Sequence, residues 1–204
     1  RLATRHRFGF LTLPRYSMIA LTSAVEPLRM ANHLCHEDVY AWSIVSLDGA
    51  PVAASNGLAL APTAALGAMG PVDVVFVCGG IDVQRAVSRD LLSALRRLAQ
   101  ERVALGSLCT GGYALAKAGL LDRYRAAIHW ENMSALREEF PRIDFTDQLF
   151  AIDRDRYTCS GGIAPLDLML NMIKGDLGAD LAVGEDRIVV QDRPAPLPVP
   201  GCTT

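Results

Sequence analysis

The sequence has no pair of cysteines in a CxxC spacing, and its cysteines are odd in number. They are Cys35, Cys78, Cys109, Cys159 and Cys202. An odd, widely spaced set argues against a disulfide framework and against a structural zinc site. We therefore expect free thiols, no bound metal or cofactor, and a reducing, cytoplasmic environment.

The sequence also lacks a long apolar run and an excess of positive charge. No stretch reaches the roughly 18 apolar residues of a membrane span, and the first ten residues, RLATRHRFGF, lack the apolar core of a signal peptide. Twenty basic and 22 acidic side chains leave a net charge of −2, whereas a DNA-binding surface needs a basic face. We therefore expect no membrane partner, and DNA contact only through a part of the protein outside this chain.

What the sequence does have is apolar content, since half of its 204 residues are hydrophobic. That is enough for the core of one sizeable domain. Strand-like and helix-like segments alternate over residues 6–184, which predicts a parallel sheet covered on both faces. Residues 185–204 are rich in proline and indicate a tail or linker.

The expected elements follow from the apolar spacing. Strands are expected at residues 6–13, 41–47, 72–78, 103–109 and 126–130, with a hairpin across 49–62 and further strands across 143–160. Helices are expected at 17–34, 84–100, from the end of the fourth strand to about 120, at 131–140 and at 163–174. Pro27 predicts a kink or break in the first helix, and Ser17 is its candidate N-cap.

The strongest local signal is the segment GSLCTGGYALAKAGLL at 106–121. A strand ends at Cys109 and a helix begins at once, with glycines around the turn, as in the elbow that exposes a nucleophile in hydrolases. The positive end of a helix favours the thiolate, and nearby N–H groups stabilise an oxyanion. The alternative interpretation is a buried structural cysteine in a tight turn, and the bare pattern gives the two about equal weight.

Two further candidates are the last two residues of the expected AAIHW strand. His129 lies at its end, and because parallel strands end at the edge of the sheet where ligands bind, His129 is expected to meet Cys109. Trp130 is a candidate for holding a quaternary ammonium group by a cation–π contact, although an aromatic residue at such a position is more often part of the core.

Beyond the elbow alone, the residues CTGGYALAKAGLLDRYRAAIHWEN resemble the core of the class I glutamine-amidotransferase-like superfamily. Four more segments resemble the amidase-like domains of AraC-family transcription regulators: SMIALTSAVEPLRMAN, WSIVSLDGAPVAASNGL, VCGGIDV and TCSGGIAPLDLMLNMI. The resemblance covers about residues 7–182 and is closest to regulators that respond to carnitine, glycine betaine and arginine. It implies an α/β, flavodoxin-like fold with a mostly parallel sheet, helices on both faces and a nucleophile elbow.

One position departs from the enzymes of this superfamily. They carry an acidic residue six positions before the one that is Glu26 here, and this sequence has Ala20 there. A cysteine and a histidine without that acid lack the group that orients or protonates their chemistry. Glu26 is interpreted as a structural or interface residue, and Glu131 as either a substitute acid or a charge that complements a helix dipole. We therefore expect no catalytic residue, with Cys109 and His129 as the residual candidates.

The expected function is a small-molecule sensor domain in a homodimer, with a C-terminal helix-turn-helix domain outside this chain reading the DNA. A stand-alone cysteine-dependent hydrolase or hydratase is the alternative, and an oligomerising scaffold with an inactive pocket is a third hypothesis. The resemblance implies an amino acid, a betaine or a carnitine-like metabolite as the effector, and backbone N–H groups in the expected pocket suit its carboxylate. The expected pocket consists of Ser17, Met18, Gly79, Gly80, Ile81, Cys109, Thr110, His129, Trp130 and Glu131.

Overall fold

A seven-stranded sheet lies at the centre of the computed structural model, which describes residues 6–129 and 133–178. Its strand order is β10-β11-β7-β6-β1-β2-β5, and every neighbouring pair is parallel except β10 and β11. The strands are β1 (His6–Thr12), β2 (Tyr40–Ser46), β5 (Ala64–Ala65), β6 (Val74–Cys78), β7 (Ala104–Leu108), β10 (Phe150–Asp153) and β11 (Arg156–Cys159). The predicted mostly parallel sheet is confirmed.

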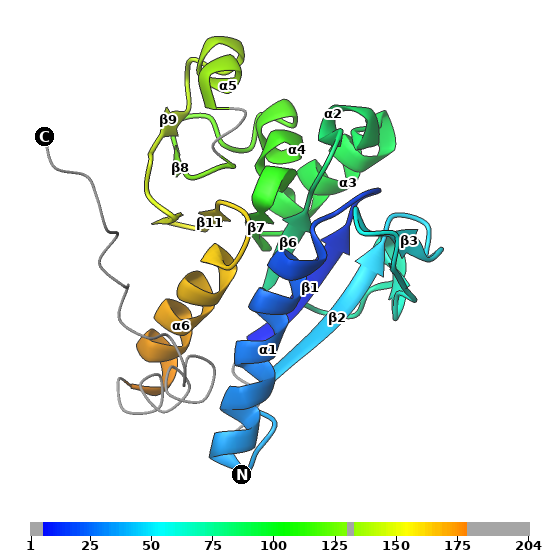
Figure 1. Ribbon diagram of the computed structural model, residues 1–204, viewed down its shortest axis with the longest axis vertical. Helices are drawn as coiled ribbons and strands as arrows, with labels where there is room; N and C mark the ends of the chain where they lie inside the picture. Colours follow the sequence, from blue (N-terminus) through cyan, green and yellow to red (C-terminus); the bar gives the residue numbers. More distant parts are fainter. Residues whose placement is uncertain (1–5, 130–132, 179–204) are drawn as a thin grey trace, which may run out of the picture.

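Helices cover both faces of this sheet, as the resemblance implied (Figure 1). On one face α1 packs against α6, over an apolar cluster that includes Phe8, Phe10 and Phe76. On the other face α3 and α4 cover a second apolar cluster, which includes Val75 and Val77 of β6. The helices are α1 (Met18–Cys35), α2 (Val83–Ala86), α3 (Arg89–Gln100), α4 (Gly112–Lys117), α5 (Met133–Glu139) and α6 (Ala164–Leu177).

The central strand β6 has the sequence VVFVC, and all five of its residues are buried. A strand with helices on both faces has no solvent side, so its sequence is a continuous apolar run rather than an alternation. In α3 the apolar residues recur at helical spacing instead, with Leu91, Leu95 and Leu98 buried and Arg96 and Arg97 exposed. These two patterns explain why sequence periodicity located both elements.

Helix α1 begins as predicted, with the Ser17 hydroxyl accepting the N–H of Ala20 at 3.4 Å. The break predicted near residues 25–26 does not occur, because one helix continues through Pro27 to Cys35. Pro27 is buried together with Ala24, Leu28 and other residues of the same face. Packing of that face on the sheet and on α6 compensates for the backbone hydrogen bond that proline cannot make.

The helix predicted over residues 84–100 is instead two helices, α2 and α3. Val87 has an extended backbone, and the Ser88 hydroxyl accepts the N–H of Leu91 at 3.1 Å. Ser88 therefore starts a new helix, and its capping hydrogen bond is a local preference that the apolar spacing did not reveal.

The strand predicted over residues 126–130 was also wrong. Only β8 (Arg125–Ala126) is a strand, and it pairs with β9 (Asp144–Phe145) in a separate two-stranded sheet. The place beside β7 in the main sheet belongs to β11, which pairs in parallel through Thr158 and Ser107. Residues 127–129 form a loop. Trp130, the last residue of the predicted strand, lies outside the described residues.

The remaining predictions on the described residues hold in outline. Within 49–62, β3 (Val52–Ala53) and β4 (Ala59–Leu60) form an antiparallel pair. The β10–β11 hairpin turns at Arg154–Asp155, within the residues 143–160 where further strands were predicted. A short 3-10 turn, Leu66–Ala68, follows β5. No described helix is long and apolar enough to cross a membrane.

Candidate functional site

The elbow lies directly after β7, where Cys109 begins a 3-10 turn (Cys109–Gly111) that continues into α4. Cys109 has a φ of 57°, a left-handed conformation that non-glycine residues rarely adopt. Such a conformation costs about 1–3 kcal/mol and persists only where the surrounding structure enforces it. The predicted strand–elbow–helix geometry is therefore present, with the thiol at the carboxyl edge of the sheet.

Glycines allow the elbow to approach the turn after β6 very closely. A Cβ at Gly79 would lie 2.7 Å from Thr110 Oγ1, and a Cβ at Gly111 would collide with the carbonyl oxygen of Val77. The N–H of Gly79 donates to the carbonyl oxygen of Leu108 at 3.2 Å. Backbone contact at this distance excludes any side chain, so these glycines hold the two turns together.

The loop before α1 completes this edge. Tyr16 forms an isolated antiparallel bridge with Gly80, in which Ser17 N–H donates to the Gly79 carbonyl at 3.0 Å and Ile81 N–H donates to the Arg15 carbonyl at 3.1 Å. Two of the three N–H groups of residues 79–81 are thus used within the fold. Among the described residues, only the Gly80 N–H of these three has no partner.

His129 reaches the site from a loop, and Gly161 shows how close it comes to Cys109. A Cβ at Gly161 would lie 2.7 Å from His129 Cδ2 and 3.0 Å from Cys109 Sγ. The imidazole and the thiol therefore lie next to each other, against the bare backbone after β11. The expected pairing of Cys109 with His129 is present, although the strand-end argument used to predict it was wrong.

Two thiols that sequence reasoning did not place here lie beside Cys109. Cys78 ends β6 and Cys159 ends β11, and both side chains are buried. Burial raises the pKa of both thiols, and their proximity to each other and to Cys109 raises the pKa of Cys78 further. The Cys159 thiol donates to the Ser107 carbonyl at 3.5 Å. The signal was available, because each cysteine closes a strand whose end faces the same edge.

Ala20, which stands where the related enzymes carry an acidic residue, is also near this edge. Ala20 is 1% exposed and belongs to the same apolar cluster as Cys109, Cys78 and Cys159. Glu26 is exposed, and its carboxylate accepts from Arg29 Nε at 2.8 Å. Among residues 6–129 and 133–178, no three His, Cys, Asp or Glu side chains are placed to hold a metal ion.

The structure thus brings most of the predicted pocket residues to one edge, and two of the predicted residues cannot be placed. Trp130 and Glu131 lie outside the described residues. Those at the edge are Ser17, Met18, Gly79, Gly80, Ile81, Cys109, Thr110 and His129. A thiol beside an imidazole, in a strained turn, is able to act as a nucleophile or to contact a small ligand. Which of the two occurs depends on the groups around the pair.

An α/β domain of parallel strands, with a cysteine elbow and a neighbouring histidine at the carboxyl edge, is the architecture that the resemblance to amidotransferase-like proteins implied. The comparison with known families agrees with this class. The chain belongs to the DJ-1/PfpI family, whose model matches residues 17–175.

Individual relatives include transcription regulators and an enzyme. The HTH-type transcriptional regulator GbdR of Pseudomonas aeruginosa is 45% identical over 91% of this chain and 50% of its own length. A solved AraC family transcriptional regulator from Pseudomonas putida has a TM-score of 0.82 and 33% identity, covering 90% of this chain and 99% of that one. An isonitrile hydratase of Pseudomonas putida is 30% identical over 86% of this chain and 74% of the enzyme. The chain spans about half the length of the regulators GbdR and CdhR.

Proposed function

We propose that this chain is the effector-sensing domain of an AraC-type transcription regulator, and that it is not an enzyme. The observation that carries the proposal is an intact elbow, with Cys109 beside His129, in a site where the acid of the related enzymes is replaced by Ala20. Without an acid to orient them or to donate a proton, Cys109 and His129 still line a polar pocket, but they do not support efficient catalytic turnover. The 45% identity to GbdR supports the same conclusion.

The proposed effector is a small zwitterion: an amino acid, a betaine or a carnitine-like metabolite. Its carboxylate binds at the Gly80 N–H and the first turn of the elbow, where Thr110 and Cys109 lie. Trp130 and Glu131 hold the cationic end. Ser17, Met18, Gly79 and Ile81 form the wall on the α1 side.

Thermal unfolding with glycine betaine, carnitine and arginine tests this proposal. At an effector concentration 100 times its dissociation constant, the expected stabilisation is about 2.7 kcal/mol. Cys109→Ala and His129→Ala are expected to lose most of it while unfolding cooperatively. Absence of stabilisation by any of the three, or an undiminished response in both variants, would contradict the pocket assignment.

The second candidate function is a cysteine-dependent hydratase or hydrolase, favoured by the 30% identity to isonitrile hydratase. An activity screen against isonitriles and amides separates the two, with Cys109→Ala as control. The sensor proposal expects no turnover that depends on Cys109. Such turnover at about 1 per second or faster, within the ordinary range of enzymes, would establish the enzyme instead.

The regulator proposal also covers assembly. We place residues 6–184 in the sensor domain, 185–204 in a tail or linker, and DNA binding in a helix-turn-helix domain outside this chain. We propose a cytoplasmic homodimer, because such regulators bind paired half-sites and because Ile19, on α1, is 53% exposed. Cys78 and Cys159 are buried thiols outside any disulfide, which supports a reducing compartment. A monomer mass in sedimentation at tens of micromolar would contradict the dimer.

A further inference from the structure

The segment that carries His129 to the site has little backbone support from the sheets. Only Arg125–Ala126 forms a ladder, and its partner β9 lies outside the main sheet. The three residues that follow belong to a loop. The position of the imidazole therefore depends on how residues 124–127 are fixed to their surroundings.

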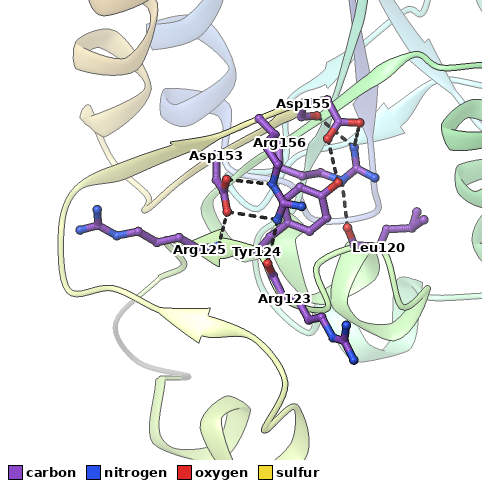
Figure 2. Close-up of polar contacts among 8 residues, drawn as sticks. Leu120, Arg123, Tyr124, Arg125, Asp153, Asp155 and Arg156 are labelled. Atoms are coloured by element: carbon purple, nitrogen blue, oxygen red, sulfur yellow. Dashed lines mark hydrogen bonds and ion pairs between the residues drawn. The ribbon is translucent and has the colours of Figure 1, made fainter.

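The first half of this segment is fixed to the turn of the β10–β11 hairpin (Figure 2). The Tyr124 hydroxyl donates to Asp155 Oδ1 at 2.8 Å, and the guanidinium groups of Arg154 and Arg156 lie 3.7 Å and 4.8 Å from the centre of its ring. The N–H of Arg125 donates to a carboxylate oxygen of Asp153 at 2.8 Å. These contacts lie at the start of β11, at the far end of that strand from Cys109.

In the second half of the segment, the Thr146 N–H donates to the Ala126 carbonyl at 3.0 Å, and a buried hydroxyl fixes the residue that follows. Thr158 is fully buried, and its Oγ1 accepts the N–H of Ala127 at 2.9 Å, two residues before His129. Thr158 is also paired in register with Ser107, two residues before Cys109. The residues after β11 then reach Gly161, against which both functional side chains pack. Thr158 is thus hydrogen-bonded to the segment that carries His129, and it is paired with β7, the strand that leads into the elbow.

We infer that Thr158 is a positioning residue, whose hydroxyl sets the place of the His129 imidazole relative to the Cys109 thiol. The inference deepens the proposed function, since it rests on these two residues forming the sensing pocket. A buried N–H that loses its acceptor is costly, so the segment moves when Oγ1 is removed. No sequence motif indicates this role of Thr158, because its partner is a backbone N–H 31 positions away in the chain.

Imidazole resonances in NMR test this inference without any effector. The chain has four histidines, so each resonance can be assigned by single substitution. Thr158→Val, which keeps the side-chain shape but removes the acceptor, is expected to shift the His129 resonance and leave those of His6, His33 and His36 in place. The Ala127 amide is expected to exchange with solvent roughly tenfold faster. Thr158→Ser, which retains a hydroxyl, is expected to restore the wild-type spectrum.

The matched control is Thr12→Val. Thr12 is also buried and uses its hydroxyl, donating to the Val45 carbonyl at 3.2 Å, but it lies on β1, with β6 and β7 between it and β11. It is expected to lower stability without moving the His129 resonance. An unmoved His129 resonance in Thr158→Val, or an equal shift in Thr12→Val, overturns the inference. If Thr158→Val does not fold, Thr158→Cys gives the same comparison, because sulfur is a weaker acceptor.

A titration with glycine betaine, carnitine and arginine then links position to sensing. Thr158→Val is expected to weaken effector binding about tenfold and Thr158→Ser to leave it near the wild-type value, as an imidazole displaced from the pocket loses its contact. If the wild-type protein binds none of the three, the sensor proposal fails. The NMR comparison still decides the role of Thr158 in that case, so the two failures are distinguishable.

Discussion

The hydroxyl of Thr110 donates a 2.7 Å hydrogen bond to the carbonyl oxygen of Gly80, thirty residues earlier in the chain. This bond joins the elbow after β7 to the turn after β6, at the place where Gly79 and Gly111 let the two backbones meet. Cys109 precedes Thr110 and has a left-handed backbone. The neighbouring turn therefore helps to hold the thiol in its strained conformation.

Removing this hydroxyl is expected to loosen the elbow. Thr110→Val leaves the Gly80 carbonyl without its donor, so we expect a loss of about 1 kcal/mol in the free energy of unfolding. Effector-induced stabilisation is expected to fall as well, whereas Thr110→Ser keeps both. Urea unfolding with and without glycine betaine, carnitine or arginine measures the two effects. Equal stability of the valine and serine variants would show that the bond contributes nothing.

Gly161 and Gly162 offer a matched pair of substitutions. Gly161→Ala places a methyl group against His129 and Cys109, so we expect loss of the effector response and a stability cost of about 1–3 kcal/mol. Gly162→Ala meets no atom within 4 Å, but its φ of 66° makes alanine strained by about 1–2 kcal/mol. Both variants are therefore destabilised, and only the first is expected to stop responding to effector in thermal unfolding. The same response in both would place the pocket elsewhere.

The two arginines around Tyr124 are expected to differ in their effect on stability. Arg156 is 5% exposed, and it donates to the Leu120 carbonyl at 2.9 Å and pairs with Asp155 at 2.8 Å. Arg156→Leu leaves the Leu120 carbonyl without this donor and leaves Asp155 with the Tyr124 hydroxyl but no ion pair to Arg156, so we expect a cost of about 2–3 kcal/mol. Arg154 is exposed, and Arg154→Leu is expected to cost about 1 kcal/mol or less despite its contact with the same ring. Denaturant unfolding of the two variants gives the comparison, and equal losses would contradict it.

Stability is expected to fall as the pH rises above about 8.5, the pKa of a thiol in an unfolded chain. Burial raises the pKa of Cys78 and Cys159 in the folded protein. Above pH 8.5 the unfolded state therefore loses thiol protons that the folded state keeps, and the free energy of unfolding decreases by up to about 1.4 kcal/mol per pH unit for each thiol. The stabilising effect of each neutral thiol is complete below that pH.

Urea unfolding at pH 7.5, 8.5 and 9.5 checks this pH dependence. The variant with both Cys78→Ala and Cys159→Ala is expected to be less stable at pH 7.5 but to show a flatter profile. The comparison uses slopes, so the loss of packing in the variant does not affect it. A slope unchanged by the double substitution would assign the effect to other groups.

The sequence by itself determined the features whose causes are local. The run VVFVC marked β6 because a strand buried on both faces is apolar throughout, and the glycines around Cys109 marked the elbow because few other residues fit there. These features depend on residues near one another in the chain. The missing acid at Ala20 came instead from the resemblance to the enzymes of the superfamily.

Only the tertiary structure decided how distant segments share the site. Periodicity gives the type of an element but not its neighbour, so the insertion of β11 beside β7 was not predicted, and residues 127–129 were assigned to a strand although they form a loop. That insertion brings Cys159 and Gly161 to Cys109 and places Thr158 under the His129 segment. Strand order is set by packing and hydrogen bonding over the whole sheet, and a linear pattern of residues does not record it.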